Sequence, residues 1–277
     1  MFFKDDKEAR ETLEKFLSMT VKSSDDVIDA FAALPNAQKY GDKPLKRFVY
    51  IPGTRDDKVL LVAHADTIWD KNYMPELLPI PQRISYMYGR YYNSNPRSLT
   101  GIGADDRAGC AILYLLRNSG HSILIVDGEE HGQIGANYLK NEHPEIFEEI
   151  NKHSFAIQFD RKNATDYKCY NIPVTNNFKN YLYRSLGYTN AGTKSKTDIV
   201  VLCQDICGAN LSVGYYGEHT EHEVLNYKQW LNTYRKVSDM LKADQKTYHT
   251  KKLAQNDDHI AIEEQKFQEP QSNEIQL

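Results

Sequence analysis

The sequence predicts an α/β protein with a largely parallel sheet and helices on both of its faces. Apolar runs at 58–63, 122–126 and 154–159 have the composition of buried strands, and segments with helical spacing lie between them. Strand and helix therefore alternate in the βαβ manner, which makes neighbouring strands parallel and packs the helices against the sheet. We expect a three-layer α/β/α sandwich with a mixed, largely parallel sheet.

Two amphipathic helices are expected first, at residues 5–19 and 24–34, where apolar side chains recur at three and four positions. Ser23 or Ser24 can cap the second helix, and Pro35 lies just past its end. Both helices should pack on the outside of the sheet.

Two hairpins are predicted next. The apolar runs 47–51 and 58–62 flank the turn-like segment Pro-Gly-Thr-Arg-Asp-Asp, which favours a hairpin between them. Residues 70–100 contain several tyrosines, which lie within the segment 73–92. Tyrosine is a normal strand residue, so a peripheral aromatic hairpin is favoured there, and a wall of a substrate site is the alternative.

The remaining elements follow from periodicity. A helix should follow the glycine-rich stretch 101–109, and residues 197–203 are ambiguous between helix and strand. Helices are further expected at 132–139, 144–151, 174–187 and 224–241, and a strand at 209–213. Beyond residue 244 the chain is polar without an apolar period, which indicates a single domain at 1–244 and a disordered tail at 245–277.

Composition excludes several classes of protein. The 34 basic and 38 acidic residues give no basic field, so no nucleic-acid partner is expected. No apolar run approaches membrane-spanning length and no signal peptide is recognisable, so we expect a soluble, cytoplasmic protein without membrane contact. The cysteines form no C-x-x-C pair and are expected to be reduced thiols: Cys110, Cys169, Cys203 and Cys207.

Charged side chains lie directly at the ends of the three predicted strands. His64 and Asp66 follow the first strand, Glu129 and Glu130 follow the second, and Asp160 ends the third. Open α/β sheets bind ligands at the carboxyl ends of their strands, so these residues should converge in space. His64 and Asp66 are two positions apart and share one face, so Asp66 can fix the tautomer of the imidazole.

Two further segments add acids and imidazoles. The stretch 101–109 (GIGADDRAG) places Asp105 and Asp106 at the start of a helix, where capping alone would explain a carboxylate. A loop before the last helix contains His219 and His222. Several strand ends with acids, together with two histidine positions, favour a metal site over solvated surface.

The order His-x-Asp, Asp-Asp, Glu-Glu, Asp and His resembles that of zinc-dependent exopeptidases with a co-catalytic metal pair, namely aminopeptidases, tripeptidases and their carboxypeptidase and deacylase relatives. The resemblance covers about residues 45–242. It implies two divalent metal ions, expected to be Zn²⁺. Carried over by position, the ligands are His64 and Asp160 for one ion, Glu130 and His219 for the other, and Asp105 as the bridge. Each ion would have three protein ligands and an open position for water, which is typical of a catalytic site.

The resemblance also implies roles for the neighbouring residues. Glu129 would be the general base, and Asp66 would support the imidazole of His64. Asp106 is expected to cap its helix and not to bind metal. The peptide bond between Asp105 and Asp106 is expected to be cis, as in several relatives.

Some assignments have alternatives. His222 competes with His219, which is favoured because the family pattern H-x-x-x-E then ends on Glu223. Asp198 either shapes the substrate end of the site or has only a role in its loop. The other three histidines that we considered are expected at the surface or at edges: His121, His131 and His153.

The spacing of the motifs predicts a site without a lid domain. Only 58 residues separate Asp160 from His219, too few for the lid that carboxypeptidase-like and tripeptidase-like relatives insert there. The lidless layout is typical of aminopeptidases, whereas GADDRAG looks closest to the tripeptidase motif. Stabilisation of an oxyanion would then fall to the metals or to Tyr215 or Tyr216.

The sequence therefore favours a zinc aminopeptidase that cleaves short peptides. An amidohydrolase or deacylase that uses the same metal pair on a non-peptide amide is the second candidate. A metal-binding module without catalysis is the third, and the intact Glu129 argues against it. The expected partner is a peptide or amide small molecule, and no oligomeric state is predicted.

Overall fold

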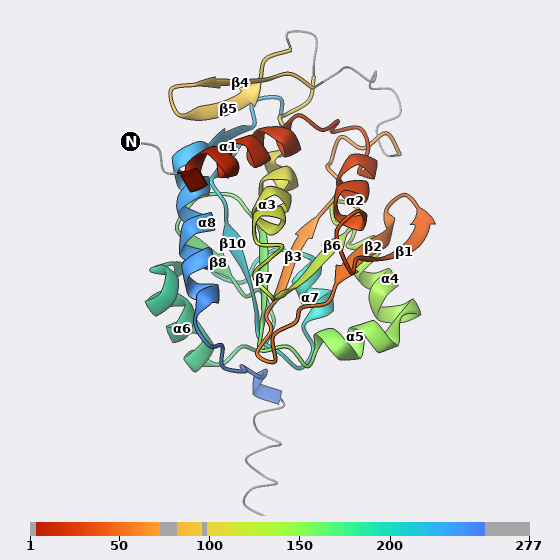
Figure 1. Cartoon of the computed structure of the whole chain (residues 1–277), viewed down its shortest axis with the longest axis vertical. Coiled ribbons are helices and arrows are strands. Elements are labelled where there is room, and N and C mark those ends of the chain that lie inside the picture. The colour runs from red at the N-terminus through yellow and green to blue at the C-terminus, as the bar shows by residue number, and fades with distance from the viewer. Residues whose placement is uncertain (1–3, 73–81, 96–98, 253–277) are drawn as a thin grey trace, which may run out of the picture.

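The computed structural model describes residues 4–72, 82–95 and 99–252, and its main feature is a mixed eight-stranded sheet (Figure 1). The four central strands β6, β3, β7 and β10 are parallel to their neighbours in this group, and antiparallel pairs flank them. In spatial order the strands are β1 (Gln38–Lys43), β2 (Lys46–Ile51), β6 (Ser122–Val126), β3 (Leu60–His64), β7 (Ala156–Arg161), β10 (Gly208–Ser212), β8 (Asp166–Lys168) and β9 (Thr189–Asn190).

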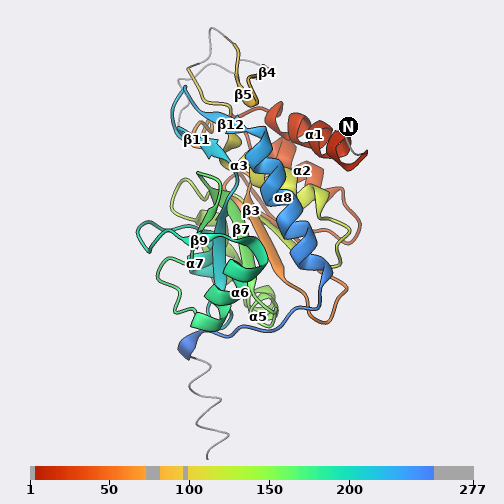
Figure 2. The same cartoon turned by 90° about the vertical axis from the view of Figure 1, so that its left-hand side faces the viewer.

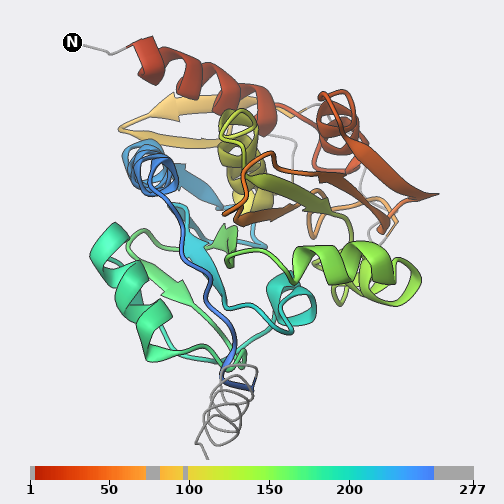
Figure 3. The same ribbon diagram turned by 60° about the horizontal axis from the view of Figure 1, so that its bottom comes forward.

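Helices form the two outer layers (Figure 3). On one face α3 (Ala104–Leu115) packs on β3 and β7, and α1 (Lys4–Leu17) and α8 (Tyr227–Lys242) contact α3. On the other face α4 (Ile134–Glu142) contacts β2, and α7 (Asp198–Leu202) contacts β7 and β10. The remaining helices are α2 (Asp25–Ala32), α5 (Pro144–Ile150) and α6 (Asn176–Leu186). The predicted α/β/α sandwich is confirmed.

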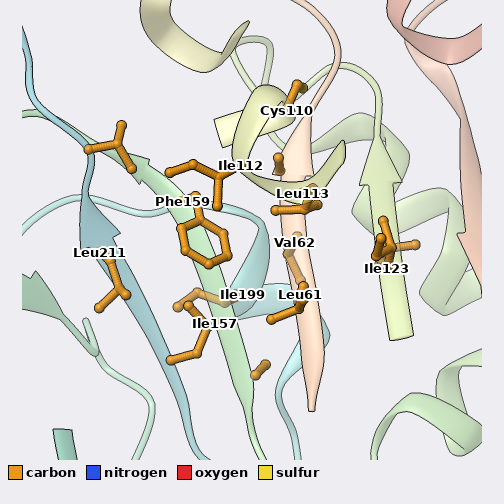
Figure 4. Close-up of a cluster of buried hydrophobic side chains, with 14 of the residues drawn as sticks. Leu61, Val62, Cys110, Ile112, Leu113, Ile123, Ile157, Phe159, Ile199 and Leu211 are labelled. Carbon is orange, nitrogen blue, oxygen red and sulfur yellow. The ribbon is translucent and has the colours of Figure 1, made fainter. Parts of the chain in front are cut away.

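The core between sheet and helices comes from the apolar runs of the sequence. Every residue of β3 and β6 is buried, as expected for central parallel strands that are covered on both faces. Figure 4 shows Ile112 and Leu113 of α3 beside Val62 and Phe159 of the central strands, and all four are fully buried. This packing fixes the strand ends and the start of α3 relative to one another.

The hairpin predicted between 47–51 and 58–62 is wrong, because β6 lies between these two strands. Val49 of β2 pairs with β6 in antiparallel register, and Val62 of β3 pairs with β6 in parallel register. β2 forms its hairpin with β1 instead. A strand that is buried on both faces belongs in the centre of a sheet, and its neighbour comes from a distant part of the chain.

A second sheet of order β11-β12-β5-β4 lies beside α1 and the start of α8 (Figure 2). Its strands β4 and β5 are antiparallel, which confirms the predicted peripheral hairpin for the described part of the segment 70–100. β5 also pairs with β12, which is joined to β11. The strands are β4 (Ile84–Met87), β5 (Arg90–Asn93), β11 (Tyr215–Tyr216) and β12 (Val224–Asn226).

The tyrosines of this hairpin pack on α1. The rings of Tyr86, Tyr91 and Tyr227 are in contact, and the guanidinium of Arg10 lies 4.4 Å from the ring centre of Tyr86. The Tyr91 hydroxyl donates to Glu14 at 2.7 Å. These rings hold the second sheet on the body, and the tyrosine at position 73 lies outside the described residues.

The packed structure extends beyond the predicted domain boundary. The ring of Tyr248 lies 5.9 Å from that of Phe155 and 5.2 Å from that of Tyr181. Its backbone N–H donates to the carbonyl of Ser154 at 2.8 Å. Packed residues thus continue past the predicted boundary at residue 244, and the predicted tail beyond Lys252 lies outside the described residues.

Two histidines that were expected at the surface or at edges are buried. The Nε2 atom of His153 lies 2.7 Å from the Ser122 hydroxyl, and its Nδ1 atom lies 3.1 Å from the carbonyl of Glu149. His121 accepts the Val59 N–H at Nδ1 (3.0 Å). Both imidazoles satisfy polar groups at strand ends, and burial lowers the pKa of His153 to about 4.

All four cysteines are buried and free, in agreement with the predicted reduced thiols. Within the described ranges, no helix combines the length and the apolar character that crossing a bilayer requires.

Removal of the last packed segment should destabilise the protein. A chain that ends at Asp244 loses the ring contacts and backbone hydrogen bonds of Tyr248, whereas a chain that ends at Lys252 keeps them. Loss of the buried ring surface alone should lower the free energy of unfolding by about 2 kcal/mol. Thermal unfolding of the two chains measures the difference, and equal midpoints would contradict the packing of this segment.

Acidification should destabilise the fold through His153. Its pKa is about 4 in the folded chain, against 6.5 for an unperturbed histidine. Between these values the unfolded chain binds more protons, so stability rises with pH there and is complete above the unfolded pKa. From pH 7.5 to pH 5 this group should cost about 2 kcal/mol. Urea unfolding of the wild type and of His153→Gln at both pH values isolates this contribution. An identical pH dependence in both proteins would show that the imidazole is not held neutral.

Candidate metal centre

The structure brings the five predicted ligands and the predicted base together. They line or underlie a pocket of about 300 Å³ at the carboxyl ends of the parallel strands. The residues come from β3 (His64), the start of α3 (Asp105), the turn after β6 (Glu129 and Glu130), β7 (Asp160) and the loop between β11 and β12 (His219). Residues that are far apart in sequence thus meet at one edge of the sheet.

The Asp105 carboxylate lies between the two imidazoles. One of its oxygens is 3.2 Å from His64 Nε2, and the other is 3.3 Å from His219 Nε2. His64 Nε2 also lies 3.4 Å from an Asp160 oxygen, and His219 Nε2 lies 2.9 Å from a Glu130 oxygen. Two sets, each with one imidazole and one carboxylate, therefore share a central carboxylate.

The start of α3 is shaped to present this carboxylate. The Asp105–Asp106 peptide bond is cis, which confirms the prediction, and both residues have non-helical backbone angles. Asp106 accepts the N–H of Gly109 (2.9 Å) and that of His64 (3.2 Å), so it caps α3 and ties it to β3. A Cβ atom at Gly109 would overlap the Asp106 carboxylate, which explains the glycine at this position.

Glu223 holds the other side of the same turn. Its carboxylate accepts the N–H of Asp105 (3.0 Å) and that of Gly103 (2.7 Å). The sequence singled out Glu223 only as the end of the H-x-x-x-E pattern. The structure shows that this pattern joins the loop of His219 to the turn of Asp105.

Asp66 links two parts of the site. Its carboxylate lies 3.3 Å from His64 Nδ1, as expected for a residue that orients the imidazole. It also accepts the backbone N–H groups of Gly128 (2.8 Å), Glu129 (3.0 Å) and Glu130 (3.2 Å). The fully buried Asp66 therefore positions the Glu-Glu turn as well as His64.

Three polar residues around Asp160 were missed from the sequence. Thr197 donates to an Asp160 oxygen at 2.8 Å, and Gln158 donates to the same oxygen at 3.0 Å. Asn210 exchanges hydrogen bonds with the backbone of Asp160. Gln158 and Asn210 are the signal that could have revealed this support, because each is an amide inside an otherwise apolar strand.

The structure also decides between alternatives. The His222 side chain is 85% exposed and contacts Glu221, so His219 is the imidazole at the site. Tyr215 lines the pocket, and its hydroxyl lies 3.4 Å from an Asp160 oxygen. Tyr216 donates instead to the side chain of Gln229, on α8.

Asp198 is buried behind the pocket wall and does not line it. Its carboxyl oxygens have no hydrogen-bond partner within the part of the chain that the structure describes. Burial raises its pKa well above the ordinary value, and neighbouring carboxylates add to the shift. The structure therefore places Asp198 behind the pocket wall and not at the substrate end of the site.

The concentration of carboxylates shifts the pKa values of the cluster. Burial and the charge of Asp105 raise the pKa of Glu130 to about 7. Hydrogen bonds to Asp105 and Glu130 raise the pKa of His219 to about 11. Burial, together with the charges of Asp160 and Asp198, raises the pKa of Glu129 well above its usual range. The site therefore attracts positive charge strongly, and imidazole and carboxylate donors fit divalent ions.

Comparisons with solved structures find the same fold in other proteins. An aminopeptidase of Bacillus cereus superposes with a TM-score of 0.59 and 13% identity over 85% of this chain and 98% of that chain. A tripeptidase of Staphylococcus aureus superposes with a TM-score of 0.57 and 13% identity over 85% of this chain and 97% of that chain. An aminopeptidase of Desulfurococcus kamchatkensis superposes with a TM-score of 0.56 and 13% identity over 84% of this chain and 94% of that chain.

The chain shares the fold of these peptidases. No protein-family model and no curated protein matches the sequence. The fold implied by the sequence resemblance is confirmed, and the role of each residue rests on the geometry described above.

Loss of either imidazole of the site should remove metal. His64→Ala and His219→Ala each delete one predicted ligand, so each protein should retain fewer ions than the wild type, which should bind two. His222→Ala is the matched control three positions away and should retain both. Elemental analysis after dialysis measures the occupancy. Metal loss in His222→Ala but not in His219→Ala would contradict the assignment.

Proposed function

We propose that the protein is a metal-dependent aminopeptidase that cleaves short peptides with two divalent ions, zinc being the expected metal. One observation carries the proposal: a single buried carboxylate, Asp105, contacts both His64 and His219. This is the arrangement that a ligand shared by two ions requires.

The ligand assignment follows the contacts. His64 and Asp160 would hold one ion, and Glu130 and His219 the other, with Asp105 between them. When bound, such an ion pair polarises the scissile carbonyl and lowers the pKa of a water nucleophile. Asp66 would keep His64 in the tautomer that leaves Nε2 free for the metal.

Glu129 is proposed as the general base. Within the described residues its carboxylate makes no ion pair, whereas the carboxylate of Glu130 contacts His219 at 2.9 Å. Its backbone is fixed by Asp66, and its side chain lines the pocket. A carboxylate in this position can take a proton from the attacking water and return it to the leaving amine.

Tyr215 is proposed to assist at the oxyanion. It is buried, lines the pocket and has its hydroxyl beside Asp160. A phenol at this position can donate to a developing negative charge. The free thiols are consistent with a reducing compartment, and we propose a cytoplasmic location.

The same machinery would also hydrolyse a non-peptide amide, as in a deacylase. Aminoacyl-anilides, acetylated amino acids and free tripeptides, assayed with zinc, cobalt or manganese, distinguish these activities. The aminopeptidase proposal requires turnover of the substrates with a free amino group. Turnover of acetylated amino acids alone would replace it with the deacylase function.

Substitution of the two adjacent glutamates should separate proton transfer from metal binding. Glu129→Gln has nearly the same shape and removes no proposed ligand, so it should keep both ions while kcat falls by about 10²–10⁴-fold with a smaller change in KM. Glu130→Gln should instead lower metal affinity, and high zinc should partly restore activity. Steady-state kinetics with metal analysis on both variants measures this. Metal loss in Glu129→Gln would mean that the two roles are reversed.

A further inference from the structure

The wall of the pocket beside the acidic cluster is cationic. Four basic side chains line it, next to the carboxylates of the proposed metal centre. They lie at the end of β7, on β8 and in the loop before α7, and they are Arg161, Lys162, Lys168 and Lys196. The pocket therefore has an acidic pole and a basic pole.

Two of the four cations are already neutralised. Arg161 forms two hydrogen bonds with the carboxylate of Asp166, at 2.9 and 3.0 Å. Lys162 forms an ion pair with Glu218 at 2.5 Å. These two side chains have their counter-charge within the protein.

The other two cations have no such counter-charge. Among the described residues, no carboxylate pairs with Lys168 or Lys196. The ammonium of Lys168 donates to the backbone carbonyl of Lys194 at 2.9 Å and lies 5.8 Å from the ring centre of Tyr170. The pairing of β8 with Asn210 of β10 fixes its backbone. Lys168 is thus held at the pocket without an ion pair among the described residues.

The surroundings of Lys168 are positive on balance. Partial burial and the charge of Arg161 lower the pKa of its ammonium, the nearby carboxylate of Asp166 opposes this shift, and the charge of Lys162 adds to it. An anion beside Lys168 would relieve this repulsion and form a charge-assisted hydrogen bond.

We propose that Lys168 and Lys196 bind the carboxylate of the substrate, so that the enzyme acts on dipeptides and tripeptides with a free C-terminus. The inference rests on the proposed peptidase function and names its substrate class. The C-terminal carboxylate of a short peptide matches the positive charge of Lys168 and Lys196 at the wall of the pocket. The volume of about 300 Å³ lies at the lower end for small-molecule sites, which also favours short substrates.

The test compares trialanine with its C-terminal amide on the zinc-loaded protein. The free acid should have a kcat/KM about tenfold higher, as expected for hydrogen bonds between charged groups. Lys168→Met and Lys196→Met should each raise KM for the free acid with little change in kcat, and should leave the amide unaffected. Equal kinetics of acid and amide in the wild type would overturn the inference.

Control variants separate the charge from the fold. Lys194→Met removes an equal charge from the same loop, but its side chain does not line the pocket, so the preference should persist. Lys168→Arg should retain much of the preference that Lys168→Met loses. Loss of preference in Lys194→Met to the same extent would overturn the assignment to the pocket lysines.

A third peptide distinguishes the source of the carboxylate. Ala-Ala-Glu amide carries its carboxylate on a side chain, and it should behave like trialanine amide. If it behaves like the free acid, recognition of the C-terminus is overturned. If no peptide is cleaved, the peptidase function fails. Calorimetry on Glu129→Gln then still measures whether the protein binds trialanine more tightly than trialanine amide. Tighter binding of the acid would support the inference, and equal binding would overturn it.

Discussion

The structure depends on keeping several carboxylates buried in one place. An ionised acid is costly to bury unless it is paired or hydrogen-bonded, and three of these acids are compensated in different ways. Asp66 takes three backbone N–H groups, Asp106 caps a helix, and Asp105 lies between two imidazoles. Because these partners come from separate loops, satisfying the acids also fixes those loops. The hydrogen bonds and ion pairs that these buried carboxylates need therefore fix the arrangement of the loops around the site.

Much of the candidate site could be predicted because most of its residues stand at the carboxyl ends of strands that are visible in the sequence. A buried apolar run is visible in the sequence, and a charge at its carboxyl end is placed by the geometry of a parallel sheet. His64, Glu130 and Asp160 are of this kind. His219 required the family pattern, since its loop has no periodic signal. The sequence could at most suggest that Gln158 holds the Asp160 carboxylate, because Thr197, which contacts both residues, comes from a distant loop.

Parts of the fold could not be predicted because they depend on partners far along the chain. The local turn signal after β2 was compatible with a hairpin, and nothing near it indicates that β6 would insert. The segment around Tyr248 is polar on average, yet one aromatic ring and two backbone hydrogen bonds hold it in place. His153 is likewise buried by contacts from elsewhere, including Ser122. The pattern of residues in a short stretch of sequence predicts a helix or a strand, but it does not predict which distant elements pack against it.

The order of the ligands along the chain bears on how the protein matures. With the assignment proposed here, His64, Asp105 and Asp160 all precede β8, so the donors for one ion are present once β7 has been synthesised. The second set is complete only when the hairpin of β11 and β12 delivers His219. A growing chain on the ribosome would thus acquire its metal capacity in two stages.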